Sequence, residues 1–189
     1  MENILIVSSS DKETDAITKI IKTIDRPLFF TSRNGKEARH ILTEIDFDVI
    51  VVNTPLQDEF GHEFALVAME TTSSGIVMLV STEIYDEVEA RMQPEGILLT
   101  PKPINRDNFF SMLKLAQTMH KRISSFKTEN VKLQKKLEDN RLIGRAKLVL
   151  IQSLGLNEPQ AHRYIEKQAM DMRITKKEVA KAIIKTYEN

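Results

Sequence analysis

The sequence contains no cysteine, and none of its 189 residues lie in a stretch of 18 uninterrupted apolar side chains. Without cysteine there can be no disulfide bond, thiol nucleophile or thiolate-bound metal. The missing apolar stretch argues against a membrane-spanning helix, and the N-terminus has no basic segment leading into a cleavable apolar one. We therefore expect a cytoplasmic protein without membrane contact.

Motifs of catalytic and cofactor sites are missing as well. The sequence has no nucleophile elbow, phosphate-binding loop or dinucleotide fingerprint. His40 and His62 have no further histidine or carboxylate at a repeating metal-ligand spacing, so we interpret them as surface histidines. The sequence thus predicts a protein that is not an enzyme and needs no cofactor or metal.

The net charge of zero conceals an asymmetry between the two ends of the chain. Residues 1–119 hold 11 basic and 19 acidic side chains, a net charge of 11 − 19 = −8. Residues 120–189 hold 16 basic and 8 acidic side chains, a net charge of 16 − 8 = +8. A basic C-terminal region favours a polyanionic partner, although a solvated lysine-rich helix face would give the same count.

Short apolar runs in the first 107 residues indicate strands, at residues 4–7, 49–52, 76–80 and 97–99, with a fifth at 27–30. Continuous rather than alternating apolar character is typical of parallel strands covered on both faces. Helical patterns with N-terminal capping signals separate the strands, including Ser10 with Glu13 and Asn34 with Glu37. This order predicts an α/β doubly wound parallel sheet whose ligand site lies beyond the carboxyl ends of the strands.

The residues at those carboxyl ends, together with a turn at Gly61, resemble a response-regulator receiver domain. That family holds Mg²⁺ with two acids after the first strand and accepts phosphate on an aspartate after the third. It keeps a threonine or serine after the fourth strand and a lysine on the fifth. In this chain the corresponding positions form a degenerate phosphoacceptor pocket of Ser8, Ser9, Asn53, Ser81 and Lys102, with Val80 as the alternative to Ser81.

These departures decide the chemistry that the resemblance implies. An amide at position 53 cannot form an acyl phosphate, and hydroxyls lack the anionic oxygens that Mg²⁺ normally needs. We therefore expect no aspartyl phosphorylation, with a regulatory protein or ligand as the input. Lys102, which has no phosphate to hold, is expected either to hydrogen-bond Asn53 or to be solvated.

A seven-residue apolar register runs from Phe109 to Asn140, with no proline or glycine between residues 109 and 142. A strict 3.5-residue repeat is typical of helices that pair along one seam. The first two heptads could equally lie on their own domain, whereas residues 123–137 predict a self-pairing helix. Asn130 at a core position favours a parallel two-stranded pair. The predicted dimerisation residues are Met119, Ile123, Phe126, Asn130, Leu133 and Leu137.

The last 49 residues, 141–189, predict a small bundle of three helices. Gly155 ends the first helix, and the capping boxes Asn157 with Gln160 and Thr175 with Glu178 open the other two. Small core residues would let the helix backbones approach closely: Ala146, Ala161, Ala169 and Ala180. We expect Tyr164 in this core.

This segment resembles the ANTAR domain, the RNA-binding module of transcription antitermination regulators. The resemblance rests on Ala146-Lys147, Gly155 with Glu158, Ala161, Ala169-Met170 and Val179-Ala180 with Ile183. One departure is Leu148, where the family commonly has glycine. The resemblance implies a dimer that binds tandem hairpins in a nascent leader RNA and prevents a terminator from forming. It also implies three parts: a pseudo-receiver at 1–119, a coiled coil at 120–140 and an ANTAR domain at 141–189.

Basic side chains of this segment are the candidates for RNA contact: Arg145, Lys147, Arg163, Arg173, Lys176, Lys177 and Lys181. Lys176 and Lys177 lie in the first turn of the third helix, where free backbone N–H groups favour phosphate. Two other functions remain open. The second and third helices could form a DNA-binding helix-turn-helix, or the chain could be an interaction protein that sequesters a partner.

Overall fold

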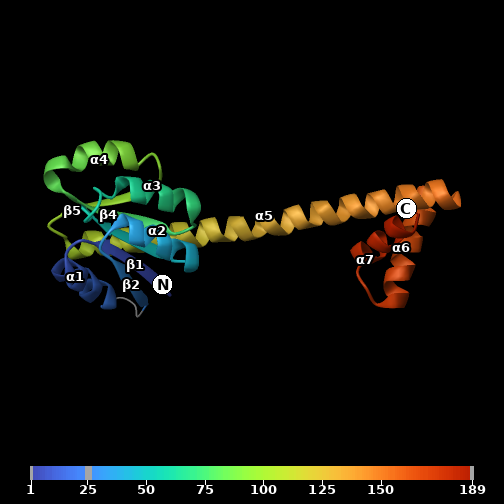
Figure 1. Ribbon diagram of the computed structural model, residues 1–189, viewed down its shortest axis with the longest axis horizontal. Helices are drawn as coiled ribbons and strands as arrows, with labels where there is room; N and C mark the ends of the chain where they lie inside the picture. The colour runs from blue at the N-terminus through green and yellow to red at the C-terminus, as the bar shows by residue number, and fades with distance from the viewer. Residues whose placement is uncertain (1, 24–26, 188–189) are drawn as a thin grey trace. The chain divides into compact units, whose positions relative to one another are not determined.

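The computed structural model describes residues 2–23 and 27–187. These residues form two compact units, Met1–Phe126 and Lys127–Asn189, and the helix α5 (Arg106–Leu154) runs without a break from the first into the second (Figure 1). No helix within the described ranges has the length and apolar character needed to span a membrane.

Five parallel strands form the sheet of the first unit, in the order β2-β1-β3-β4-β5. The strands are β1 (Asn3–Ser8), β2 (Leu28–Ser32), β3 (Val49–Asn53), β4 (Gly75–Ser81) and β5 (Leu98–Lys102). The predicted doubly wound parallel sheet is therefore confirmed. Its register pairs Ser8 with Asn53 and Ser81 with Lys102, so both pairs lie at the carboxyl ends of the strands.

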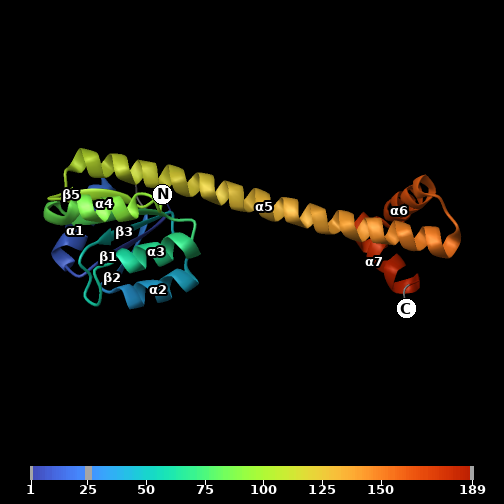
Figure 2. The ribbon, with the colours of Figure 1, turned by 90° about the horizontal axis from the view of Figure 1, so that it is seen from above.

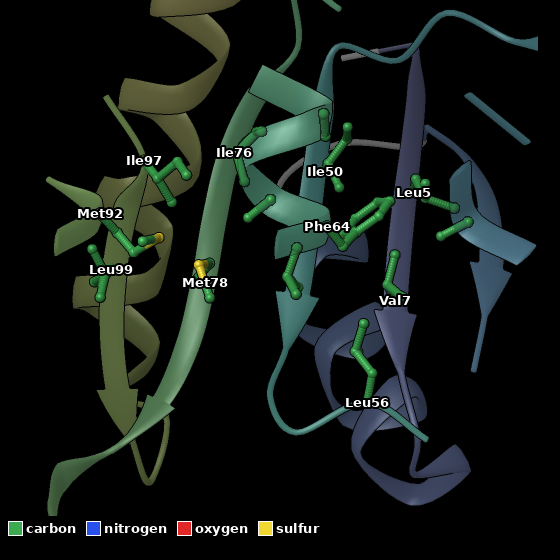
Figure 3. Packing of buried hydrophobic residues seen from close by; sticks show 14 of the residues in the cluster. Leu5, Val7, Ile50, Leu56, Phe64, Ile76, Met78, Met92, Ile97 and Leu99 are labelled. Atoms are coloured by element: carbon green, nitrogen blue, oxygen red, sulfur yellow. The ribbon is translucent and has the colours of Figure 1, made fainter. Parts of the chain in front are cut away.

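Helices cover both faces of this sheet (Figure 2). They are α1 (Asp11–Lys22), α2 (Gly35–Glu44), α3 (His62–Thr71) and α4 (Tyr85–Met92), with a short 3₁₀ turn η1 (Thr82–Ile84) before α4. The core on one face joins α2, α3 and α4 to the sheet, and the core on the other joins α1 and the start of α5. Figure 3 shows the first of these cores, where Phe64 of α3 lies over Leu5 and Ile50. Because both faces are buried, every residue of a strand can be apolar.

The first turns of α5 pack on the sheet rather than on another helix. Phe109 and Ala116 are fully buried there, so the first two heptads lie on their own domain. The close approach requires glycine at position 75, since a Cβ atom there would lie 2.1 Å from the Ala116 carbonyl oxygen. His120 ties the helix to the segments that precede β4 and β3, because its Nδ1 is bonded to the Ser73 carbonyl and its Nε2 lies 3.2 Å from the Asp48 carboxylate.

The second unit packs the end of α5 against α6 (Glu158–Met172) and α7 (Lys176–Tyr187). Its core contains Ala146, Val149, Leu150, Ala161, Ile165, Val179, Ala180 and Ile183, with Ala169 packed against them. Both predicted capping boxes are present, because Gln160 and Glu178 each bond back to the backbone of the capping residue. The prediction that Tyr164 is a core residue was wrong. Its side chain is 38% exposed, because Ile165 and Ala161 occupy the buried face of α6.

Candidate functional site

Asn53 lies at the centre of the pocket at the carboxyl edge of the sheet. The Asn53 side chain is 2% exposed, and its Nδ2 atom donates to Ser8 Oγ at 2.8 Å and to Glu13 Oε2 at 2.5 Å. Both amide hydrogens are thus used within the pocket. Ser8 Oγ also donates to the Ser10 carbonyl, which fixes the acceptor that Asn53 uses. An amide held in this way offers no nucleophilic oxygen for phosphate.

Lys102 enters the same pocket from β5. Its Nζ atom donates to the Thr54 carbonyl at 2.5 Å and lies 3.7 Å from Glu13 Oε2. The expectation of a hydrogen bond from Lys102 to Asn53 was wrong. The Lys102 ammonium group instead bonds the Thr54 carbonyl, and the Glu13 carboxylate supplies a countercharge.

Glu13 is the functional residue that sequence reasoning missed. The capping signal assigned Glu13 to the first turn of α1, and its backbone N–H does donate to Ser10 Oγ at 3.3 Å. The carboxylate, however, turns toward Asn53 and Lys102. Its position one turn after the carboxyl end of β1 was the available signal. Asp11, the nearer acid in sequence, instead forms a two-point ion pair with Arg33.

The two remaining hydroxyls of the pocket are engaged elsewhere. Ser9 Oγ donates to the Pro55 carbonyl at 2.8 Å, and Ser81 Oγ accepts from the Glu83 backbone to cap η1. Val80 is fully buried in the sheet core, whereas Ser81 lies at the strand end beside Lys102. No group of three histidine, cysteine or acidic side chains that could hold a metal ion occurs within residues 2–23 and 27–187.

A row of apolar side chains on α5 is exposed beyond the sheet. Ile123, Phe126, Leu133 and Leu137 are 37%, 65%, 49% and 60% exposed, and Asn130 is exposed among them. Met119, the first predicted dimerisation residue, is half-buried and lies beside Gly96 of its own sheet domain. The seam positions from Ile123 onward therefore present apolar surface.

Three of the lysines predicted to contact RNA form ion pairs within the second unit, each at 2.5 Å. Lys147 pairs with Glu158, Lys176 with Glu166, and Lys177 with Asp139. The hydrogen bonds from Lys147 and Lys176 hold the pKa of Glu158 and of Glu166 below the ordinary value, and the bond to Asp139 raises the pKa of Lys177. Each pair joins two of the three helices, so these lysines brace the bundle.

Lys147 and Lys177 are held at different levels of α5. Lys177 is paired to Asp139, and Lys147 lies eight residues further along α5. Eight residues of helix rise by about 12 Å.

Other predicted cations extend into solvent. Arg163 and Lys181 are exposed and form no salt bridge with any described residue, and the same holds for Lys167 and Lys185. Arg163 and Lys167 are four residues apart on α6, as are Lys181 and Lys185 on α7, so each pair lies on one helix face. Arg145 is also exposed, and Arg173 occupies the turn between α6 and α7. Arg163, Lys167, Lys181 and Lys185 are therefore available to an external anion.

Comparison with known proteins shows what the two parts of this chain are similar to. The ANTAR domain model matches residues 131–184, which begins inside the segment predicted as the coil. The transcriptional regulatory protein PdtaR of Mycobacterium tuberculosis is 26% identical over 153 residues, covering 81% of this chain and 75% of that protein. The aliphatic amidase regulator of Pseudomonas aeruginosa is 26% identical over 130 residues, covering 68% of this chain and 66% of that protein.

Solved structures show the fold of the first unit. The signal receiver domain of an HD domain-containing protein from Pseudomonas fluorescens superposes with a TM-score of 0.59 at 13% identity, covering 66% of this chain and 92% of that one. A response regulator receiver domain protein from Clostridium thermocellum gives 0.58 at 17% identity, covering 65% and 99%. The sheet domain thus has the receiver fold, and residues 131–184 after it match the ANTAR domain model.

Proposed function

We propose that this chain, in which an ANTAR domain follows a receiver fold, is a dimeric RNA-binding transcription antiterminator. Two copies joined through α5 bind tandem hairpins in a nascent leader RNA and keep a terminator from forming. The observation that carries the proposal is the set of solvent-facing cations on the ANTAR helices α6 and α7. Cationic side chains that contact phosphates release the counterions condensed on a nucleic acid, and this release supplies most of the sequence-independent affinity.

The cations divide into two roles. Arg163, Arg173 and Lys181 face solvent and contact RNA directly. The lysines at 147, 176 and 177 are held by acids of neighbouring helices, so they act mainly by keeping the three helices in place. Their ammonium groups retain further hydrogen atoms for a phosphate at the edge of the bundle.

Dimerisation is supported by the exposed seam of α5. Leu133 and Leu137 leave apolar surface in water, and burying it against the same surface of a second copy is favourable by about 25 cal/mol per Å². Asn130 lies one turn before Leu133, at a position where asparagine favours one register of a parallel pair. Two ANTAR domains on one coil would bind two hairpins with an avidity that neither has alone.

Regulation without aspartyl phosphorylation is supported by the pocket of the sheet domain. Asn53 replaces the acceptor, and the charge of Lys102 is already balanced by Glu13. The proposed input is a regulatory protein or a ligand that binds the pseudo-receiver. Such an input shifts the protein between states only through its different affinity for each.

Filter binding tests the proposal against its two alternatives. A two-hairpin RNA and a DNA duplex of equal length are compared at matched salt, with the RNA taken from a pool with randomised loops after selection on the protein. We expect tight binding of selected RNA and only weak, salt-sensitive binding of duplex. Preference for duplex DNA would favour the helix-turn-helix alternative. If the RNA pool yields no binder and duplex DNA does not bind either, the remaining alternative is an interaction protein that sequesters a partner.

A further inference from the structure

Two helices of the second unit end with a residue in the left-handed conformation, but the residues differ. At the end of α5 this residue is Gly155, with φ +67°. At the end of α6 it is Arg173, with φ 53° and ψ 42°. Glycine adopts this conformation at no steric cost, whereas a side chain brings its Cβ atom close to the carbonyl oxygen. Arg173 is the one non-glycine residue with positive φ in the described ranges.

The backbone N–H groups of this turn are hydrogen-bonded without any contribution from the arginine side chain. The N–H of Arg173 donates to the Met170 carbonyl at 3.2 Å, and the N–H of Ile174 donates to the Ala169 carbonyl at 3.1 Å. This pair of bonds is the Schellman motif, in which glycine is the usual left-handed residue. The fold therefore needs the turn but does not need an arginine in it.

Exposed apolar side chains surround Arg173. Met170 is 78% exposed, Met172 is 61% exposed and Ile174 is 39% exposed. Leaving large apolar groups in water forgoes their burial energy, and here three of them flank one strained cation. Departures from local preference that coincide at one turn are typical of functional positions.

We propose that residues 170–174, the α6–α7 turn, contact unpaired bases in the loop of an RNA hairpin. The inference rests on the proposed RNA-binding function and names the part of the RNA that this turn takes. Hairpin loops expose unstacked bases, which planar and apolar side chains can cover. The guanidinium group of Arg173 can stack on a base or bond its edge in two places. Met170 and Met172 are flexible and polarisable, so they fit base faces of different shape.

A phosphate contact would not account for this composition. Phosphate recognition needs cations and backbone donors, which α6 and α7 already present at Arg163 and Lys181. Methionine adds nothing to the recognition of an anion. The turn and the outward cations therefore divide the task, the cations holding the backbone of the RNA and the turn contacting its bases.

Two substitutions in the full-length chain test the inference, with the selected two-hairpin RNA as the probe. Met172→Ser removes apolar surface without a change of charge, and Arg173→Gly places the preferred residue in the turn. We expect each to weaken binding by about tenfold or more, the scale of a lost base contact. The thermal midpoint of Arg173→Gly should not fall below that of the parent, because its turn is relieved of strain.

Salt dependence and abasic RNA separate base contact from phosphate contact. Met172→Ser should leave the slope of the logarithm of the association constant against log salt unchanged. Arg163→Ala, the control, should make this negative slope shallower by about 0.7 to 0.9. Replacing the loop bases by abasic sites should weaken the parent strongly and Met172→Ser little further. If the selected RNA binds both turn variants as tightly as the parent, the inference is overturned and the proposed function stands. If selection yields no RNA for the parent, both fail.

Discussion

The Oε2 atom of Glu13 lies 3.7 Å from the Nζ atom of Lys102, and it also accepts a hydrogen bond from the amide of Asn53. A side chain of α1 thus balances the charge of a lysine on β5, across the edge of the sheet where a receiver would hold its phosphoryl group. The polar groups of this pocket thus bond to one another.

Incubation with acetyl phosphate and Mg²⁺ should therefore leave the intact mass of the protein unchanged. Asn53→Asp should also stay unmodified, because Ser8 and Ser9 still stand where metal-binding acids would be needed. Intact-mass spectrometry of both proteins, before and after incubation, provides the measurement. A stoichiometric adduct on the parent that survives acid and is lost in alkali would contradict the assignment of the pocket.

Charge placed in the seam of α5 should convert the proposed dimer into monomers. Phe126→Lys combined with Leu133→Lys would put four ammonium groups into one interface of two copies, where they repel each other and lack countercharges. Both side chains are exposed in the single chain, so its fold should be retained. Light scattering reports the mass, and circular dichroism reports the helix content.

Val131→Lys is the matched control, since Val131 is 59% exposed on the same helix but outside the predicted seam. This variant should remain dimeric. If the double variant of the seam also remained dimeric, the dimer interface would have to lie in another part of the chain.

Removal of two outward cations from α6 should weaken hairpin binding through lost phosphate contacts. Arg163→Ala with Lys167→Ala breaks no salt bridge with any described residue, so helix content and thermal midpoint should stay near those of the parent. The negative slope of the logarithm of the association constant against log salt should become shallower by about 1.4 to 1.8, which corresponds to two lost phosphate contacts. Filter binding over a series of salt concentrations measures both effects.

Lys12→Ala with Lys19→Ala is the control for net charge, because it removes two exposed cations from α1 of the sheet domain. RNA affinity should be unaffected by it. An equal loss of RNA affinity in the two double variants would mean that the net charge of the protein, rather than the cations of α6, sets the affinity.

Asp58 should stabilise the sheet domain in a pH-dependent manner. Its two carboxylate oxygens accept from the backbone N–H groups of Gly35, at 2.7 Å, and Lys36, at 3.0 Å, at the start of α2. The bond from Gly35, helped by that from Lys36, holds the pKa of Asp58 below its ordinary value. A lowered folded-state pKa means that the contribution is complete above the unfolded value, about 3.9, and is lost as the pH falls through the folded value.

Asp58→Asn should therefore be less stable than the parent at pH 7, and the difference should shrink as the pH falls below about 4. Thermal unfolding of both proteins between neutral and acid pH measures the difference. Asp86→Asn, an acid in the first turn of α4, is the control for general loss of negative charge. A gap between parent and Asp58→Asn that stayed constant down to the acid limit would show that the carboxylate charge is not the cause.

Local patterns in the sequence were sufficient to predict the strands and helices and their order along the chain. Continuous apolar runs predicted the strands, because a strand buried on both faces needs apolar residues at successive positions. The capping pairs at Ser10, Asn34, Asn157 and Thr175 located the helix starts, since each satisfies backbone N–H groups within three residues. Periodicity and capping act over a few residues, so they can be recognised without a fold.

The roles of individual polar and charged side chains depended on the tertiary structure. Glu13 has the same local signal whether it caps α1 or reaches Asn53, which is 40 residues away. The lysines at 147, 176 and 177 count as basic residues in the sequence, but only packing of the three helices brings acids to them.

The seven-residue register shows both contributions in one helix. The sequence by itself determined that Phe109 to Asn140 would be helical with an apolar stripe, because the 3.5-residue spacing puts those side chains on one side. It could not decide what would cover each part of the stripe. The tertiary structure buried Phe109 and Ala116 under the sheet and left Phe126 and Leu133 exposed, because the sheet ends where α5 continues.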